Sequence, residues 1–411
     1  MLLDNASPEK TPSPWLVVGF GTLIVFTTLG MRHAFGFFLD PITTTLTGVN
    51  RDSFGLAVAI QNLVWGFSQP LAGMIADRYG TARVIFVGGI LYTAGLLITA
   101  ASTGPIGIHI GFGVFVGLGL GCATFAVVLG AVGRAFPPER RTTALGVASV
   151  GGAVGIFCSV PITIWLITQF GWQGALVSIA ALAATVCLAA PFLAGRSDRS
   201  STQQSLGDAL RQAIRHRGFL LLVLGFFVCG FQLAFFATHL PAYLLDRQMP
   251  LWVGGAALGL IGLTNIVGTF GCGVLGDRMS KTRLLAGLYT VRGVIALWFL
   301  LTPISPATVM IFAAVMGFTW LGTVPLTSGV VAQIFGVRYI GTLVGIVFLM
   351  HQVGSFLGAW LGGVVYEANG SYDTVWWAVV VLAFAAALIH LAIDERPTGL
   401  DLKKSIAARI A

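Results

Sequence analysis

Charged side chains are scarce in this chain, and their scarcity excludes a soluble globular protein. Only 9% of the 411 residues are Asp, Glu, Lys or Arg, whereas 56% are hydrophobic. This balance is typical of helical membrane proteins. The 54 glycines agree with that class, because helices in lipid associate through small residues that let their backbones approach.

Cysteine is also rare, and its placement excludes two kinds of site. The five cysteines lie inside apolar stretches at unrelated spacings, so they predict neither a disulfide framework nor a metal site. No hydrophobic stretch carries a nucleophile–base pair, and we expect neither catalysis nor a cofactor. The first residues, 1–14, are polar and lack a signal peptide, so we expect the first hydrophobic stretch to remain as a helix.

Hydrophobic stretches of about 20 residues, the length that crosses a bilayer, recur along the chain. They fall into two groups of six on either side of a polar, basic stretch. We therefore predict an all-α membrane protein with an N-terminal bundle (1–195), a linker (196–217) and a C-terminal bundle (218–411). The predicted spans are 15–40, 53–76, 84–103, 106–133, 142–168, 172–194, 219–245, 252–276, 284–302, 306–331, 339–366 and 373–393.

The basic residues are distributed unevenly over the connections. Nineteen of the 23 Lys and Arg residues lie in the termini and the connections on the same side, leaving Arg32, Arg51, Arg247 and Arg292. The positive-inside rule then predicts that both termini are cytoplasmic. The net charge of +8 is thus an orientation signal and predicts no nucleic-acid partner.

The two halves of the chain are copies of one unit. When the sequence is shifted by 200 residues, Asp77 and Arg78 fall on Asp277 and Arg278. Parallel repeats of this kind place a substrate site between the halves near the bilayer midplane. Rocking of the halves then gives alternating access.

The connection between the second and third spans carries a recognisable motif. It consists of Gly73, Asp77, Arg78, Gly80 and Arg83, with Thr81 and Ala82 where basic residues are usual in such motifs. In this motif, and over nearly its whole length, the chain resembles the major facilitator superfamily (MFS). The resemblance implies twelve helices in two pseudo-symmetric bundles, and transport of a solute.

The same motif predicts a gate. We expect Asp77 to accept hydrogen bonds from the N-terminal amides of a neighbouring helix, with Arg78 or Arg83 neutralising it or binding lipid phosphates. The alternative is a basic loop that only sets the orientation in the membrane. The predicted gating residues are Gly73, Asp77, Arg78, Arg83, Asp277 and Arg278.

Arg32 lies near the middle of the first hydrophobic stretch. A guanidinium is not neutralised by deprotonation, and at the bilayer centre it costs roughly 3 kcal/mol even on insertion scales. We therefore expect Arg32 to have a partner. Its planar fork suits a carboxylate in two parallel hydrogen bonds, and the alternative is an arginine bonded to carbonyls of a neighbouring helix.

Acidic residues are missing from the central part of every predicted span. All fifteen Asp and Glu residues lie in loops, tails or helix ends. A buried cation requires an anion, so the substrate is the best candidate partner of Arg32. This reasoning predicts a secondary transporter of a small organic anion, with a monocarboxylate favoured, coupled to protons.

An alternative is an MFS efflux transporter of drugs or metabolites. Proton-driven exporters of cationic drugs in this superfamily generally use an acid within the membrane, which this chain lacks. The nearest resemblance is to bacterial monocarboxylate transporters and oxalate:formate antiporters, at Asn265 in the eighth span. Those families usually have a substrate-binding arginine four residues on, where this chain has Thr269, so Arg32 is the expected replacement.

Further side chains complete the predicted site. His351 and His239 are candidates for proton coupling, because an imidazole titrates near neutral pH, although His351 also suits helix packing. We expect Arg292, in the ninth span, to be a structural cation. The predicted substrate-binding residues are Arg32, Asn62, Gln232, Asn265, Trp320, His351 and Gln352.

These interpretations define the expected setting of the protein. We expect a monomer in contact with lipid in the cytoplasmic (inner) membrane of a bacterium, with a small anion and protons as partners. A receptor that kept the fold would bind its ligand without flux. The duplicated gate motif favours a transport cycle instead.

Overall fold

The computed structural model describes residues 13–194 and 205–398, and every regular element within these ranges is a helix. The first half contains α1 (Pro14–Val25), η1 (Phe26–Gly30), η2 (Phe35–Phe38), α2 (Leu39–Thr45), α3 (Arg51–Tyr79), α4 (Thr81–Ala100), α5 (Pro105–Ile108), η3 (His109–Phe115), α6 (Val116–Ala123), α7 (Phe125–Ala135), α8 (Pro138–Ala189) and η4 (Ala190–Leu193). The second half contains α9 (Leu206–Arg215), α10 (Arg217–Asp246), α11 (Leu251–Arg278), α12 (Lys281–Leu301), α13 (Pro306–Phe318), α14 (Thr323–Phe335), α15 (Ile340–Asn369) and α16 (Asp373–Leu391).

The prediction of twelve spans is confirmed. Ten helical segments of the described chain are long and apolar enough to cross a membrane. One of them, Pro138–Leu193, holds two spans, because Gly171 with a φ of 67° interrupts α8. The twelfth is the more polar α3, whose 29 residues form a helix of about 44 Å.

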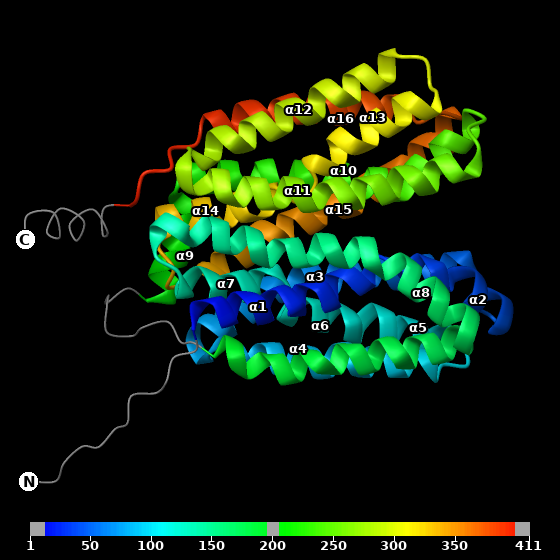
Figure 1. Cartoon of the computed structure of the whole chain (residues 1–411), viewed down its shortest axis with the longest axis horizontal. Coiled ribbons are helices and arrows are strands. Elements are labelled where there is room, and N and C mark those ends of the chain that lie inside the picture. The colour runs from blue at the N-terminus through cyan, green and yellow to red at the C-terminus, as the bar shows by residue number, and fades with distance from the viewer. Residues whose placement is uncertain (1–12, 195–204, 399–411) are drawn as a thin grey trace, which may run out of the picture.

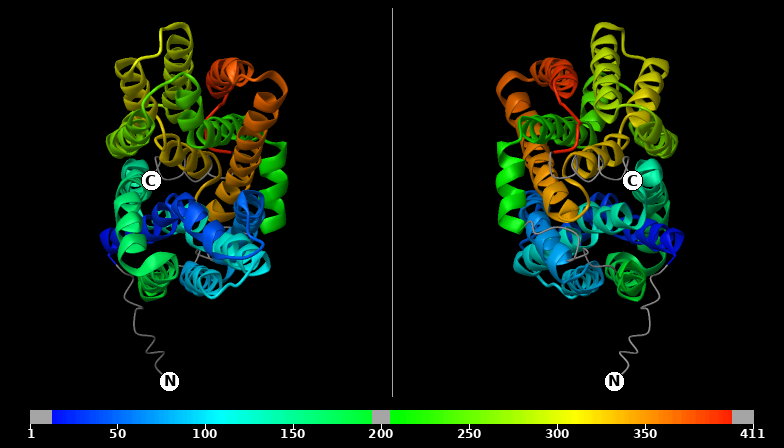
Figure 2. Two further views of the ribbon diagram at one scale, coloured as in Figure 1. Left: turned by 90° about the vertical axis from the view of Figure 1, so that its right-hand side faces the viewer. Right: turned by 90° about the vertical axis from the view of Figure 1, so that its left-hand side faces the viewer.

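The helices form two layers (Figure 1). Helices α1–α8 make up the lower layer and α10–α16 the upper one, and the described chain begins and ends at the same end of the molecule, on the left (Figure 1). We call this end the terminal end and the other the opposite end. The end-on views show the same two groups of helices above and below each other (Figure 2).

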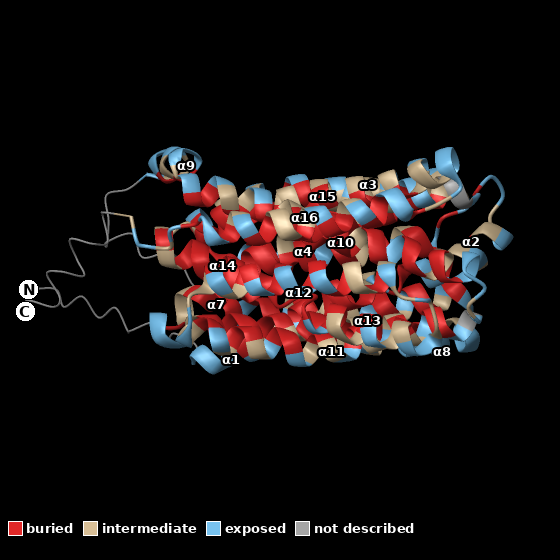
Figure 3. Cartoon of the chain, turned by 90° about the horizontal axis from the view of Figure 1, so that it is seen from above, coloured by how far each residue is buried: buried red, intermediate tan, exposed pale blue. Residues whose placement is uncertain are grey.

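Burial follows the pattern that a bilayer requires. Buried residues run through the middle of the molecule, while exposed ones lie on its outer faces and at its two ends (Figure 3). Many exposed residues are large and apolar, among them Phe67, Trp165, Trp252 and Leu388. Apolar surface on this scale is stable only against lipid or another protein.

Three of the spans are irregular along their length. The first changes from the α-helix α1 to the π-helical η1 and then to the 3₁₀-helical η2. The fourth breaks at Thr124, which has extended backbone between α6 and α7, and the tenth breaks between α13 and α14. Non-helical backbone at membrane depth is tolerated only inside protein or along a cavity, because its polar groups need partners.

The two halves repeat a tertiary contact as well as a sequence pattern. The hydroxyl of Tyr92 on α4 donates to the carbonyl of Thr28 at 3.1 Å, and that of Tyr289 on α12 donates to the carbonyl of Gly225 at 3.1 Å. Each donor lies 64 residues after its acceptor. This agreement is what duplication of a six-helix unit produces.

Candidate functional site

Arg32 is held by one face of α3. Its Nε donates to Oε1 of Gln61 at 3.0 Å, and its Nη2 donates to Oδ1 of Asn62. The guanidinium also lies over the indole ring of Trp65, 4.9 Å from the centroid. We call these four residues the Arg32 clamp; a cation over an aromatic ring adds about 0.5–2 kcal/mol of attraction.

The Arg32 clamp contains no acid. Its acceptors are two neutral amide oxygens, which orient the guanidinium without cancelling its charge. Arg32 takes part in none of the ion pairs between described residues, which are Arg134–Asp77, Arg247–Asp373 and Arg396–Asp394. Within the described chain its charge therefore remains without a carboxylate partner, as the distribution of acids predicts.

The clamp is anchored on the irregular fourth span. Nε2 of Gln61 donates to the carbonyl of Phe112 in η3 at 3.0 Å, and Nε1 of Trp65 donates to Oγ1 of Thr124 at 3.1 Å. Gln61 and Trp65 are buried, whereas Arg32 and Asn62 are half-buried. The anchored pair thus holds the outer pair in a defined orientation.

His351 and Gln352 on α15 lie against the same region of α3. A Cβ at Gly66, the residue after Trp65, would lie 3.0 Å from Cβ of Gln352. Nδ1 of His351 interacts with Oε1 of Gln352 at 3.1 Å, while the buried Nε2 of Gln352 has no partner among the described residues. The structure therefore brings these two predicted residues next to the helix that carries the Arg32 clamp.

An aromatic layer lies one turn from His351 on the terminal side. The rings of Phe125 on α7 and Phe348 on α15 are 5.4 Å apart across the two bundles, and Phe226 on α10 lies 5.0 Å from Phe348. His351 packs on Phe226 at 5.0 Å. These rings fill the space between the bundles on the side of the terminal end.

Arg292 is a structural cation inside the C-terminal bundle, as the sequence indicates. It is fully buried, and all five of its N–H donors have acceptors. Nη2 donates to the carbonyls of Thr319 and Trp320 at 2.5 and 2.7 Å, and Nε donates to Oγ1 of Thr319 at 3.3 Å. Nη1 donates to Sγ of Cys229 and Oε1 of Gln232, each at 3.4 Å.

Three residues predicted to bind substrate lie around the interrupted tenth span in the C-terminal bundle, where the buried Nδ2 of Asn265 has no partner among the described residues. Gln232 is fully buried and uses both ends of its amide, on Arg292 and on the carbonyl of Val379. Trp320 is buried at the break between α13 and α14. Asn265 accepts there from the amide of Leu321 at 2.9 Å. Together with Arg292 they supply the polar partners that the interrupted tenth span needs.

His239 also packs within its own bundle. Its Nε2 lies 2.7 Å from the carbonyl of Ala359, and its ring fills the space over Gly362 on α15. Only 9% of His239 is exposed. The structure does not bring His239 to the Arg32 clamp.

Asp77 closes the terminal end between the bundles. It accepts from the amides of Gly341 and Thr342 at 3.3 and 2.7 Å and from the hydroxyl of Thr342 at 2.8 Å. These amides open α15, so the carboxylate lies at the positive end of the helix dipole, as the sequence predicts. Gly73 permits the approach, since a Cβ there would lie 2.3 Å from the carbonyl oxygen of Gly341.

The basic residue beside Asp77 differs from the prediction. Arg134, at the end of α7, donates to Asp77 at 2.8 Å, whereas Arg78 lies over the ring of Tyr79 and Arg83 is exposed. The expectation that Arg78 or Arg83 neutralises Asp77 was therefore wrong, whereas its alternative, that they bind lipid phosphates, stays a prediction. The motif places them on the outer surface of the helix, and folding brings Arg134 to Asp77 from another span.

Asp277 makes the corresponding contact in the second half. It accepts from the amides of Thr142 and Thr143 at 2.8 Å each, at the start of α8. Gly146 and Gly273 let α8 and α11 approach, since a Cβ on Gly146 would lie 2.7 Å from Cα of Gly273. The exposed Arg278 lies beside this contact in sequence. Two pseudo-symmetric contacts thus join the bundles at the terminal end.

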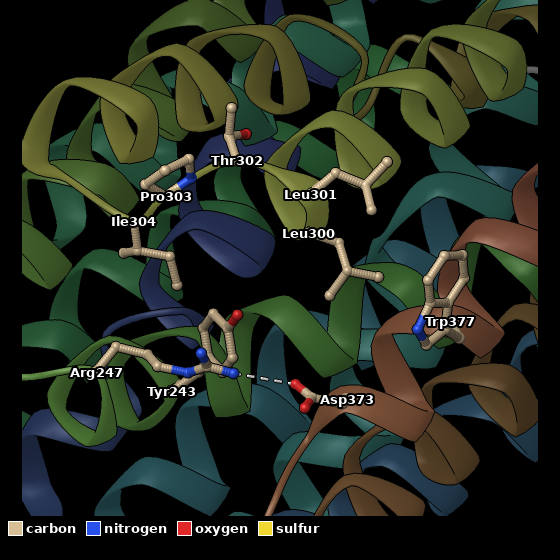
Figure 4. Close-up of a pocket in the computed structure, with 9 residues that line it drawn as sticks. All are labelled: Tyr243, Arg247, Leu300, Leu301, Thr302, Pro303, Ile304, Asp373 and Trp377. Carbon is tan, nitrogen blue, oxygen red and sulfur yellow. Dashed lines mark hydrogen bonds and ion pairs between the residues drawn. The ribbon is translucent and has the colours of Figure 1, made fainter.

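A separate pocket lies at the opposite end of the C-terminal bundle. It has a volume of about 460 Å³ and is lined by residues of α10, α16 and the α12–α13 connection (Figure 4). Within it Arg247 donates to Asp373 at 3.1 Å and lies over Tyr243 (Figure 4). None of the predicted substrate-binding residues lines this pocket.

Comparison with known proteins identifies the fold and its role. A sequence model of the Major Facilitator Superfamily matches residues 18–350. The chain belongs to the major facilitator superfamily. As a member of this superfamily it is a multi-pass membrane transporter and not an enzyme. The residues around Asp77 and Asp277 form two equivalent contacts within this MFS fold.

Curated relatives align over almost the whole MFS chain. Monocarboxylate transporter 13 of Rattus norvegicus is 27% identical, covering 94% of this chain and 90% of the relative. Monocarboxylate transporter 11 of Homo sapiens is 25% identical, with coverages of 96% and 86%. The MFS-type transporter YcxA of Bacillus subtilis is 24% identical, with coverages of 92% and 94%.

Solved structures of MFS symporters share the fold. A variant of the fucose:proton symporter FucP of E. coli matches with a TM-score of 0.75 and 15% identity, covering 93% of this chain and 99% of that one. The proton:xylose symporter XylE, bound to 6-bromo-6-deoxy-D-glucose, matches with a TM-score of 0.71 and 14% identity, with coverages of 92% and 94%.

Several residues of these sites were not among the predicted ones. Gln61 precedes Asn62 on α3 and Trp65 lies one turn after this pair, and that spacing is the signal that groups them with Asn62. For Arg134, the only signal in the sequence was its position near the end of a span. The sequence indicated that Cys229 is a packing residue. Its contact with Arg292 was not predictable, because the two residues lie 63 positions apart.

Proposed function

We propose that this MFS protein carries a small monocarboxylate together with protons by alternating access. The observation behind this proposal is the Arg32 clamp, a half-buried guanidinium held by neutral groups. Holding a cation at this depth without an anion is unfavourable, so a bound carboxylate lowers the free energy of the site.

The orientation of Arg32 suits an end-on carboxylate. Gln61 and Asn62 occupy the edge formed by Nε and Nη2. The Nη1 donors have no acceptor in the described chain, so the edge formed by Nη1 and Nη2 can donate two parallel hydrogen bonds to a carboxylate. Charge-assisted bonds of this kind contribute about 1.5–3 kcal/mol each.

Other predicted residues supply further donors. Nδ2 of Asn62 remains a donor while Oδ1 accepts from Arg32. The unpaired Nε2 of Gln352 and the ring of His351 lie on α15, which packs at Gln352 against Gly66 of the helix that carries the Arg32 clamp. We assign the carboxylate to Arg32 and Asn62 and the rest of the small substrate to Gln352 and His351.

The relatives support the substrate class. Two of the proteins that align with nearly the whole chain are monocarboxylate transporters of rat and human. Proton coupling agrees with the absence of acids from the span centres, because the anion and a proton can then cross together as a neutral pair. The structural neighbours FucP and XylE are themselves proton symporters by name.

We further propose that the terminal end faces the cytoplasm of a bacterial cell, which the excess of Lys and Arg at that end supports. Under this assignment Asp77, Asp277 and the aromatic layer close the cytoplasmic side of a monomer. Breaking these contacts while new ones form at the opposite end would present the Arg32 clamp to the cytoplasm.

Binding to purified protein tests the proposal. Thermal stabilisation is measured with acetate, lactate, pyruvate and oxalate, and with acetamide and lactamide as uncharged counterparts. We expect acids but not amides to stabilise the wild type. Arg32→Ala should weaken binding of the best acid by roughly 10- to 100-fold, because it removes at least one charge-assisted hydrogen bond.

Arg247→Ala is the matched control, since it removes a positive charge from the exposed pair with Asp373. It should leave acid binding unchanged. Equal stabilisation of wild type and Arg32→Ala by neutral compounds, with none by the acids, would favour efflux of uncharged compounds and overturn the proposal. Stabilisation by an acid without uptake into proteoliposomes would indicate a receptor.

A further inference from the structure

The pocket at the opposite end of the C-terminal bundle lies at the depth of lipid headgroups. Three spans end there: Tyr243 and Arg247 lie at the end of α10, Leu301 is the last residue of α12, and Asp373 is the first residue of α16. The ends of spans lie where the hydrocarbon core meets the headgroups, and Tyr and Trp are enriched there. Tyr243 and Trp377 both line this pocket. A lipid headgroup is therefore a polar group that the pocket meets in a membrane.

One cation and one anion line the pocket. Nη2 of Arg247 donates to Oδ1 of Asp373 at 3.1 Å, and about half of each side chain is exposed, 47% and 52%. Among the described residues, Nε and Nη1 of Arg247 and Oδ2 of Asp373 have no hydrogen-bond partner, so both groups can bind a ligand while they contact each other. The pair has no net charge, which favours a ligand that carries both signs.

The end of α10 fixes the position of Arg247. The amide of Met249 donates to the carbonyl of Leu244 at 2.9 Å, as in a Schellman motif, and Gln248 has a φ of 61°, in the left-handed region that such a motif requires. The guanidinium also lies over the ring of Tyr243, 5.3 Å from its centroid. Backbone and ring together hold this cation at the pocket.

The wall across from the charge pair is apolar and continues onto the outer surface of the bundle. Leu300, Leu301 and Ile304 lie across the pocket from the pair, and Trp377 lies beside Asp373 (Figure 4). Leu301 is 68% exposed and Trp377 is 47% exposed. Helices α12 and α16 lie on the side of the C-terminal bundle away from the N-terminal bundle (Figure 1). This surface therefore faces lipid and suits acyl chains.

We propose that the pocket binds the headgroup of phosphatidylethanolamine, in which a phosphate and a primary ammonium are joined by a short ethylene link. The phosphate accepts hydrogen bonds from Arg247 and from the hydroxyl of Tyr243, which points into the pocket (Figure 4). The ammonium donates to Oδ2 of Asp373. The acyl chains run over Leu301 and Trp377 toward the centre of the membrane.

Volume and charge favour this headgroup over two alternatives. The volume of about 460 Å³ lies within the roughly 300–1,000 Å³ that small-ligand sites have. A phospholipid with a net negative headgroup would bring no cation to Asp373, and its phosphate would be repelled by that carboxylate. A soluble zwitterion would match the charge pair and leave the apolar wall without a partner.

Lipid binding by delipidated full-length protein in detergent tests the proposal. Native mass spectrometry counts the lipids bound from equal concentrations of phosphatidylethanolamine and phosphatidylglycerol with the same acyl chains. We expect the wild type to prefer phosphatidylethanolamine. Arg247→Gln should weaken this binding by roughly 3- to 10-fold, because it removes one half-exposed charge-assisted contact. Asp373→Asn should abolish the preference, since it removes the partner of the ammonium and keeps that of the phosphate.

Two controls accompany these variants. Arg396→Gln removes a positive charge from the exposed pair with Asp394, at the terminal end, and should retain both binding and preference. Glycerophosphoethanolamine has the same headgroup without acyl chains, and it should not compete at equal concentration.

A photoreactive phosphatidylethanolamine locates the bound lipid in the unchanged protein. With a diazirine near the start of an acyl chain, illumination should label the peptides that contain Leu301 or Trp377. Asp373→Asn should lower this labelling relative to that by phosphatidylglycerol carrying the same group. Labelling confined to other helices overturns the assignment of the pocket.

The remaining outcomes also decide the proposal. Equal binding of the two lipids by the wild type overturns it, as does a preference that survives Asp373→Asn. Competition by glycerophosphoethanolamine would indicate a soluble ligand and overturn the lipid assignment. Acid binding at Arg32 is measured without added phospholipid, so Arg247→Ala remains its control and either proposal can fail alone.

Discussion

At the scale of single residues, the Arg32 clamp orients the guanidinium without neutralising its charge. Gln61 and Asn62 hold the guanidinium of Arg32 through amide oxygens, whose dipoles attract a cation without supplying a full negative charge. A carboxylate in either position would satisfy the same hydrogen bond and also cancel the charge. Because the amides are neutral, the positive charge of Arg32 remains available to attract an anionic ligand.

This distinction makes a prediction for Asn62. Asn62→Asp retains the shape and the oxygen acceptor but provides an internal counter-ion. We expect the protein to melt at the same or a higher temperature and to lose its stabilisation by carboxylic acids. Thermal shifts with and without the best acid measure both effects.

Asn62→Leu serves as the companion variant, because it removes the hydrogen bond without adding a charge. It should weaken acid binding less than Asn62→Asp does. Wild-type acid binding by Asn62→Asp would show that the charge of Arg32 is not what attracts the substrate.

At the scale of elements, α3 carries both the site and the gate. Gln61, Asn62 and Trp65 occupy one stretch of the helix, and Gly73 and Asp77 occupy its terminal end. A continuous helix transmits displacement along its axis, so movement of Asp77 away from α15 also moves the clamp. We infer that substrate occupancy and gate closure are linked through α3.

Gly73→Ala tests how tightly α3 must approach α15. The added Cβ would meet the carbonyl of Gly341 at 2.3 Å, and backbone cannot yield as a flexible side chain does. We expect the terminal ends of the bundles to separate and the rate of transport to fall. Spin labels at the exposed positions of Arg83 and Arg283 would report the separation as a longer distance.

The matched control is Gly55→Ala on the same helix, where a Cβ meets nothing within 4 Å. It makes the same chemical change and should alter neither the distance nor the rate. An unchanged distance in Gly73→Ala would mean that the glycine contact does not hold the gate closed.

At the scale of the whole molecule, two equivalent contacts hold the terminal end. Asp77 of the first half binds the start of α15 in the second, and Asp277 of the second half binds the start of α8 in the first. Each carboxylate interacts with two helix amides and the dipole behind them, which contributes about 0.3–2 kcal/mol. Together, the two contacts hold the bundles closed at two places along their interface.

The two contacts should act additively. Asp77→Asn and Asp277→Asn each retain an oxygen acceptor and lose the charge, so each should shift the spin-label distances toward the open form. Because the two contacts involve different helix pairs, their effects on the free energy of the closed-to-open equilibrium should add in the double variant. We expect the larger single effect at Asp77, which also loses its ion pair with Arg134. A double variant no more open than Asp77→Asn would show that one contact alone controls the gate.

Several properties of this protein follow from the order of its residues alone. Hydrophobic length determines the twelve spans, and the repeat at 200 residues places Asp77 and Asp277 in equivalent positions. The absence of acids from the span centres predicts that Arg32 has no carboxylate partner at its depth, and none of the ion pairs between described residues includes it. These features are local or compositional, so they do not depend on which helices pack together.

Folding alone decided the partners of the polar side chains. Gln232 and Asn265 lie at the depth expected of substrate ligands, yet they support the interrupted tenth span together with Arg292. Arg134 and not Arg78 reached Asp77. Hydrophobic periodicity tells how deep a residue lies and which residues share a helix face. The neighbour across that face depends on close packing of side chains and glycines from distant parts of the chain, which only the assembled bundle determines.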